Sequence, residues 1–161
     1  QRTRKNLHFV CANINTALET LLCRAAAVSG SLGLVLIQFP DPWKKARHKS
    51  RRVVQSDFAD RLGRLLGLPR CGQPGLLSFA SDREEIALDM RACVKASEWF
   101  KPAVGPKFGD AHFASNSHSW HTVHPLGHGV ATERERVSEA LRRNVFRLCL
   151  EVHPPGWSEE K

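Results

Sequence analysis

The sequence predicts an α/β protein with a layered sheet, on the basis of three observations. With 161 residues, the chain is long enough for one domain with a hydrophobic core. Apolar runs typical of strands alternate along it with stretches that have helical periodicity. The longest apolar run, residues 32–39, is continuous, which is typical of a strand covered on both faces in a parallel sheet. Alternation of strand and helix is the pattern of a layered α/β fold.

The first half of the chain supplies most of these elements. We expect a strand at residues 7–12, a helix at 16–28 that ends near Gly30, and the strand at 32–39. A helix follows at 53–66, a Gly- and Pro-rich turn at 67–75 and a strand at 75–80. Ser81 and Asp82 are expected to cap a helix that runs to about residue 96, with Asp82 and Glu85 forming a capping box.

The second half differs because Gly, Pro, Ser and His dominate residues 101–131 and periodicity disappears there. We expect a long loop or inserted segment at these positions. A short helix at 132–143 and a closing strand at 146–152 follow, and residues 154–161 read as a frayed tail. The expected organisation is a single domain over residues 1–153 with one insertion.

The charge balance points to an anionic partner. Lys and Arg number 24 against 16 Asp and Glu, which gives a net charge of +8. Six of the nine residues from Lys44 to Arg52 are Lys or Arg, so the excess is concentrated in one segment. Such a basic segment favours nucleic acid or an anionic surface. No apolar run approaches the ~18–20 residues that a membrane span needs, so no membrane partner is expected.

The five cysteines are widely scattered, odd in number and include no C-x-x-C pair. Buried thiols in a reducing intracellular compartment explain them better than a disulfide framework does. Cytoplasm, nucleus and organelle all meet this condition, so the compartment stays open. The residues are Cys11, Cys23, Cys71, Cys93 and Cys149.

A histidine series near the end of the insertion invites a metal interpretation, because regularly spaced imidazoles on a helix can converge on Zn²⁺. Pro125, Gly127 and Gly129 interrupt any helix there, and no Cys or acidic cluster accompanies the series. We therefore expect no metal site. The residues are His118, His121, His124 and His128.

One segment joins a carboxylate to the positive charge. The apolar run ends in Pro40-Asp41-Pro42, and Trp43 and the basic residues follow directly. Ligands of open α/β sheets bind beyond the carboxyl ends of strands, and the two prolines restrict the turn. The sequence thus places a fixed carboxylate at the edge of a cationic surface, which suits chemistry on a polyanion.

Four segments form a recognisable series along nearly the whole chain, apart from residues 101–124. They are residues 6–13, residues 39–43 with the basic run to Gln55, residues 79–82, and residues 125–127 leading to Thr132-Glu133-Arg134-Glu135. Together they resemble the tRNA (guanine-N7)-methyltransferase family, which methylates guanine in the tRNA variable loop with S-adenosylmethionine. The proline-flanked Asp, the Trp and the basic run carry most of the specificity. The resemblance implies a Rossmann-like class I methyltransferase sheet.

The resemblance also implies residue roles. Asp41 would be the catalytic carboxylate; because guanine N7 is already nucleophilic, the reaction needs alignment more than a strong base. From the residues alone Asp41 could equally cap a turn, Asn13 could be a turn residue, and Trp43 could stack on a base or anchor the turn. The implied sets are Asn13, Ile14, Gln38 and Asp41 for the cofactor; Lys45, Asp82, Thr132 and Glu135 for the substrate; and Lys44, Arg47, His48, Lys49, Arg51 and Arg52 for the tRNA backbone.

The chain departs from the family in two respects. Members open with a strand and a Gly-rich loop for the cofactor, but the eleven glycines here include no G-x-G-x-x-G. Ile14 stands where many members have Ala and would crowd the adenine. We therefore expect the C-terminal part of a longer enzyme, with a sheet incomplete at its N-terminal strands and unpaired strand edges.

Two alternatives to an active enzyme remain, namely a catalytically inactive tRNA-binding module and a partial gene product. The expected partner is tRNA. A noncatalytic partner subunit is expected if the protein is of the nuclear type, and otherwise a monomer or homodimer.

Overall fold

The computed structural model describes residues 9–30, 32–67, 75–103, 120–121, 124–126 and 130–156. In this part of the chain four strands form one sheet in the order β1-β2-β4-β3. β1 and β2 are parallel, whereas β4 pairs antiparallel with both β2 and β3. The mixed sheet with its helices confirms the predicted Rossmann-like α/β class. The strands are β1 (Leu34–Gln38), β2 (Leu76–Ser81), β3 (Phe100–Pro102) and β4 (Phe146–Val152).

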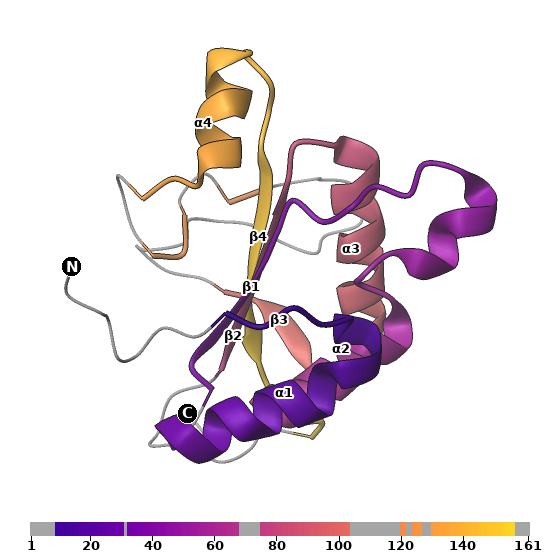
Figure 1. Ribbon diagram of the computed structural model, residues 1–161. Coiled ribbons are helices and arrows are strands. Elements are labelled where there is room, and N and C mark those ends of the chain that lie inside the picture. Colours follow the sequence, from indigo (N-terminus) through magenta and orange to yellow (C-terminus); the bar gives the residue numbers. More distant parts are fainter. Residues whose placement is uncertain are drawn as a thin grey trace.

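The helices lie in two places relative to this sheet. α3 packs against β2, β3 and β4, α2 packs on α3, and α1 packs on α2 (Figure 1). α4 stands at the other location, the end of the sheet where β1 and β2 finish and β4 begins (Figure 1). The bounds are α1 (Ile14–Ser29), α2 (Ser56–Leu66), α3 (Glu84–Ala96) and α4 (Glu133–Ala140), with a 3-10 helix, η1, at Ala46–Arg51.

The hydrophobic core lies between the sheet and α2 and α3. Leu77 and Phe79 of β2 lie opposite Leu150 and Leu148 of β4, and all four side chains are fully buried. Burying one such side chain contributes about 1.5–3 kcal/mol, so these rows are the main support of the sheet. The helices complete the core with Phe58, Leu62, Leu66, Ile86, Met90 and Val94.

Two expectations about strands are wrong. Residues 9–12 form no strand: Phe9 is 91% exposed, and no strand of the described part lies alongside to pair with its backbone. β1 is not covered on both faces, because Leu36 is 37% exposed. Within the described residues β1 pairs only with β2, so it is an edge strand. Its other edge has no strand beside it in this part of the chain. β4, by contrast, has the predicted bounds.

The helix starts and ends also differ from expectation. Asp82 does not cap α3: the N-cap is Arg83, without a side-chain cap, and the Arg83 N–H donates to Ser81 Oγ at 3.1 Å. α2 begins at Ser56 rather than residue 53, because Val54 turns into the core ahead of the helix. α4 ends at Ala140, short of residue 143. The turn at 67–75 and the insertion at 101–131 lie largely outside the described residues.

The cysteine prediction is wrong for two of the described thiols. Cys11 and Cys23 are exposed, because one lies in the irregular N-terminal segment and the other on the outer side of α1. Cys93 is half-buried and Cys149 is buried, and burial raises the pKa of both thiols. Cys71 lies outside the described residues.

Candidate functional site

The turn after β1 holds Asp41 in strained backbone. Phe39 and Trp43, on either side of Pro40-Asp41-Pro42, have φ angles of 49° and 38°. Bulky residues seldom adopt positive φ; each such residue costs about 1–3 kcal/mol, persists only where its surroundings hold it, and is typical of functional sites. The Phe39 N–H still donates to the Ala80 carbonyl at 2.8 Å, so the turn starts directly at the sheet. Asp41 is therefore presented, exposed, just beyond the carboxyl end of β1.

A hollow of about 670 Å³ opens beside Asp41. It lies between the N-terminus of α1, the Asp41 turn and the far end of the basic segment. Its volume is in the range of about 300–1,000 Å³ that is usual for small-molecule sites. Three of the four predicted cofactor residues line it, whereas Gln38 does not. The lining residues are Ala12, Asn13, Ile14, Asn15, Asp41, Trp43, Ser50, Arg51 and Val53.

Asn13 and Asn15 give the hollow its polar wall. Asn13 is the N-cap of α1, and its Oδ1 accepts the Asn15 N–H at 3.0 Å. Asn13 therefore has the local structural role that its position at a turn allows, and it also lines the hollow. The Asn15 Oδ1 is buried and has no hydrogen-bond partner among the described residues. The amide of Gln38 is in the same condition. Because buried polar atoms are nearly always paired, the Asn15 Oδ1 beside the hollow is an acceptor left for a ligand, whereas Gln38 lies outside the lining.

Trp43 also lines the hollow, and two residues of the basic segment contact its ring; of these, Arg51 lines the hollow as well. The Arg51 guanidinium lies 5.2 Å from the Trp43 ring centroid, and the His48 ring meets the indole edge-on at 5.7 Å. Trp43 is half-buried by these contacts. The geometry favours a turn anchor over an aromatic surface free to stack on a base.

The basic segment presents most of its charge to solvent. Lys44, Lys45, Arg47, Lys49 and Arg51 are exposed, and His48 is half-buried. Arg52 differs, because its side chain is only 15% exposed and its guanidinium binds Asp89 and the Pro42 carbonyl. Arg52 thus has partners within the protein, and its predicted contact with the tRNA backbone stays a prediction.

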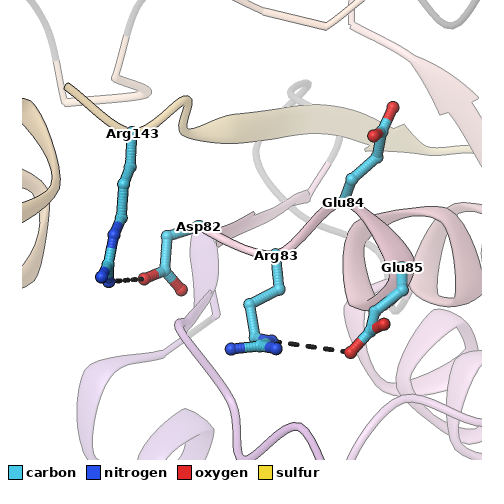
Figure 2. Close-up of a pocket in the computed structure, with 5 residues that line it drawn as sticks. All are labelled: Asp82, Arg83, Glu84, Glu85 and Arg143. Atoms are coloured by element: carbon cyan, nitrogen blue, oxygen red, sulfur yellow. Dashed lines mark ion pairs between the residues drawn. The ribbon is translucent and has the colours of Figure 1, made fainter.

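Asp82 lies at the same edge of the sheet as Asp41, because β1 and β2 are parallel neighbours in register. Its side chain is only 8% exposed and pairs with Arg134 of α4 at 2.6 Å and with Arg143 at 3.9 Å. Figure 2 shows the Asp82–Arg143 pair beside a hollow of about 470 Å³ that Arg83, Glu84 and Glu85 also line. Asp82 thus ties α4 to the end of β2, a link that the capping prediction missed.

Thr132 and Glu135 form a complete capping box at the start of α4. The Glu135 carboxylate accepts the Thr132 N–H at 2.6 Å and binds the Arg147 guanidinium at 2.8 and 2.9 Å. Burial alone would raise the pKa of Glu135, but the hydrogen bonds from Thr132 and Arg147 outweigh it and lower the pKa. Both side chains thus have a structural task, and their predicted contact with substrate stays a prediction. The sequence prediction did not use Arg147, whose charge inside an otherwise largely apolar strand indicates a buried acidic partner such as Glu135.

The described histidines of the series have backbone partners. His121 Nδ1 accepts the Cys149 N–H at 2.9 Å, and Nε2 lies 3.1 Å from the Ala103 carbonyl. His124 Nδ1 accepts the Leu126 N–H at 3.2 Å. The residues that the structure describes contain no group of three or more side chains able to hold a metal ion, while His118 and His128 lie outside them.

Fold and site together define a class of protein. An open α/β sheet carries a ligand-sized hollow and a carboxylate beyond the carboxyl end of an edge strand, where such sheets bind ligands. The chain matches over residues 1–148 the model of a family described as "Putative methyltransferase". It therefore belongs to this methyltransferase family, as the motif series predicts.

The curated relatives that the chain matches include tRNA (guanine-N(7)-)-methyltransferases of cyanobacteria. The Nostoc sp. protein is 35% identical over 146 residues, which are 91% of this chain and 57% of the relative. The Synechocystis sp. protein is 34% identical over 150 residues, or 93% and 61%. A protein of the same name from Actinobacillus pleuropneumoniae is 40% identical over 86 residues, or 53% and 30%. The chain thus spans about half the length of the curated relatives it matches.

Proposed function

We propose that the full-length protein transfers a methyl group from S-adenosylmethionine to N7 of guanine in the tRNA variable loop. The activity for which the relatives are named and the family match support this proposal. The observation that carries it is the strained turn, which presents the Asp41 carboxylate at the mouth of a ligand-sized hollow with exposed cations directly behind it. Family membership implies a methyl donor of the S-adenosylmethionine type, which supplies an electrophilic methyl group when bound.

The residues around the hollow fit such a donor. The unpaired Asn15 Oδ1 is an acceptor that suits the exocyclic amino group of an adenine. Ile14, which we expected from the sequence to crowd the adenine, lines the hollow and would instead offer an apolar surface to its ring. Asn13 lies beside them at the start of α1, where the helix dipole is positive and the first turn holds no acidic side chain. Asn13, Ile14 and Asn15 would therefore hold the donor's base.

Asp41 would orient the guanine. A carboxylate with no ion-pair partner among the described residues can accept hydrogen bonds from guanine N1–H and the N2 amino group. Two such bonds fix the base, which directs its N7 lone pair toward the hollow. Alignment of this kind supplies up to about 7–11 kcal/mol in favourable cases, so no strong base is required. The same charge would also balance a cationic donor.

The exposed cations would bind the substrate's phosphates. Lys44 and Lys45 follow the turn directly in sequence, and Arg47, Lys49 and Arg51 extend the positive surface. Phosphate contacts of this type set affinity and register rather than base choice. Asp82, Thr132 and Glu135 would shape the second flank of the substrate surface by holding α4 in place.

Among the described residues no helix is long and apolar enough to cross a membrane. We propose an intracellular, reducing compartment, with the protein acting as a monomer or homodimer, or with a noncatalytic subunit if it is of the nuclear type.

The test is the variant Asp41→Asn in the full-length protein, assayed by transfer of labelled methyl to guanine N7 of tRNA. Loss of orientation should reduce kcat by about 10²-fold or more. Asp57→Asn, an exposed acid on α2 outside the hollow beside Asp41, is the matched control and should keep wild-type activity. Full activity of Asp41→Asn would reject the assignment.

A further inference from the structure

Asp89 of α3 is the acidic group into which the basic segment is anchored. Two cations of the segment reach its Oδ2: Lys49, with Nζ at 3.4 Å, and Arg52, through its guanidinium. The Asp89 side chain is 29% exposed and that of Arg52 is 15% exposed, whereas Lys49 is 66% exposed. The Asp89–Arg52 pair is therefore partly shielded from solvent, where an ion pair holds geometry better than at the open surface.

Arg52 also returns to the turn that holds Asp41. Its Nε donates to the Pro42 carbonyl at 3.1 Å, while its guanidinium reaches Asp89. Its backbone carbonyl accepts from Gln55 Nε2 at 3.1 Å and Asn15 Nδ2 at 3.5 Å. One side chain thus closes the segment from Pro42 to Arg52 into a loop whose ends are bonded to each other.

The bonded carbonyl belongs to the peptide that enters the strained residue. Pro42 precedes Trp43, whose φ is 38°. Positive φ at a bulky residue persists only when surrounding contacts hold it, and the Arg52–Pro42 hydrogen bond is such a contact. The six cations between Lys44 and Arg52 repel one another, so an anion that fixes two of them also keeps the loop closed.

We infer that Asp89 and Arg52 are positioning residues that hold the Asp41 turn and the basic segment in register for catalysis. Neither touches the reacting atoms; Asp89 acts through Arg52, and Arg52 acts through the Pro42 carbonyl. The catalytic consequence rests on the proposed function, but the structural consequence, a tethered segment, does not.

The test compares Asp89→Asn with Glu98→Gln in the full-length protein. Glu98 is an exposed acid just after α3, so its variant loses the same charge and breaks no pair among the described residues. The first readout is trypsin cleavage at native temperature, with mass spectrometry used to identify cuts after Lys44, Lys45, Arg47, Lys49 or Arg51. We expect these cuts to be about tenfold faster in Asp89→Asn, because the segment opens locally, and unchanged in Glu98→Gln. Equal rates would overturn the inference.

The second readout is steady-state methyl transfer. A turn held out of register should lower kcat by about 10- to 100-fold in Asp89→Asn, with a smaller change in KM for the methyl donor. Asp89→Glu, which restores the charge, should recover part of kcat, and a merely structural role would give no such recovery. A change in KM alone would contradict the inference. If wild type shows no methyl transfer, the proposed function fails while the trypsin comparison still decides whether the tether exists.

A reciprocal variant guards against misfolding. Arg52→Lys keeps the charge next to Asp89 but lacks the fork of donors that reaches both Asp89 and Pro42. Its melting temperature should stay close to that of wild type while its cleavage and kcat follow Asp89→Asn. Wild-type cleavage and kcat in Arg52→Lys would overturn the role of the Pro42 bond.

Discussion

At the scale of single residues, Glu135 shows how a charge is kept inside the protein. Glu135 is 3% exposed, and yet the pKa of its carboxyl group is lowered, because the Thr132 N–H and the Arg147 guanidinium donate hydrogen bonds to it. Arg147 lies on β4 and Glu135 on α4, so the pair also fixes the helix to the sheet. Removal of one partner leaves a buried charge without compensation.

Arg147→Ala should therefore destabilise the protein by about 3 kcal/mol at neutral pH. The pKa of Glu135 is lowered in the folded state, so the unfolded state binds more protons below the ordinary value of 4.5. The stabilisation from this pair is thus full above pH 4.5 and is lost as the pH falls through the folded-state pKa. Urea unfolding from pH 7 to pH 3.5 measures it, and the variant should show a shallower loss.

Arg136→Ala is the control for this prediction. Arg136 is exposed on the same helix and pairs with no acid in the described residues, so its variant should stay within about 0.5 kcal/mol of wild type. Equal stability of the two variants would show that the Glu135–Arg147 pair contributes nothing.

At the scale of elements, α2 makes a close contact with Trp99 that its own sequence pattern does not predict. Its amphipathic face predicts the buried Phe58, Leu62 and Leu66, but Gly63 is buried as well. A Cβ at Gly63 would lie 2.4 Å from the Cβ and Cγ of Trp99, so the helix approaches the α3–β3 turn more closely than a side chain allows. Gly63 therefore serves packing, not chain flexibility.

Gly63→Ala should destabilise the protein despite the better helix propensity of alanine. The propensity gain is about 1 kcal/mol, whereas overpacking typically costs about 1–3 kcal/mol. The cost lies in the upper part of that range here, about 2–3 kcal/mol, because the new methyl group meets the Cβ of Trp99, which cannot swing away. We expect a net loss of about 1–2 kcal/mol, seen as a lower urea midpoint with an unchanged m-value. Arg64→Ala, exposed on the same helix, should be neutral. A stabilised Gly63→Ala variant would contradict the close approach.

At the scale of the whole molecule, charge is unevenly distributed in relation to the sheet. The exposed cations of the basic segment follow the carboxyl end of β1, and α4 with its arginines stands at the same end of the sheet (Figure 1). A net charge of +8 attracts a polyanion without preference for any face, but this arrangement favours binding at the end of the sheet where β1 finishes. Binding of tRNA there would release counterions and so depend steeply on salt.

Lys45→Ala should weaken tRNA binding by the full-length protein and reduce the slope of log K against log salt by about 1. Arg24→Ala removes an equal charge from α1, outside the basic segment, and should leave the slope unchanged. Filter binding over a series of salt concentrations checks both. Identical slopes for the two variants would show that the basic segment is not the contact surface.

Local and periodic features were predictable from the sequence. The runs that became β1, β2 and β4, the buried face of α2, and the placement of Asp41 after a strand all follow from side-chain period and turn chemistry. The family membership followed from the order of the motifs. Residues 9–12 show the limit, because an apolar run becomes a strand only where another strand accepts its hydrogen bonds.

What the tertiary structure alone decided is the pairing of charges that lie far apart in the sequence. From the sequence Asp82 is a plausible helix cap, but in the structure it forms an ion pair with Arg134 of α4. Arg52 likewise looks like one more cation of a basic run, but in the structure it forms an ion pair with Asp89 of α3. Such choices depend on which elements the sheet order brings together, and the energy of an ion pair depends on the burial that results. Sequence spacing determined which residues stand at the strand ends; the packing of α3 and α4 decided which of them are left free to meet a substrate.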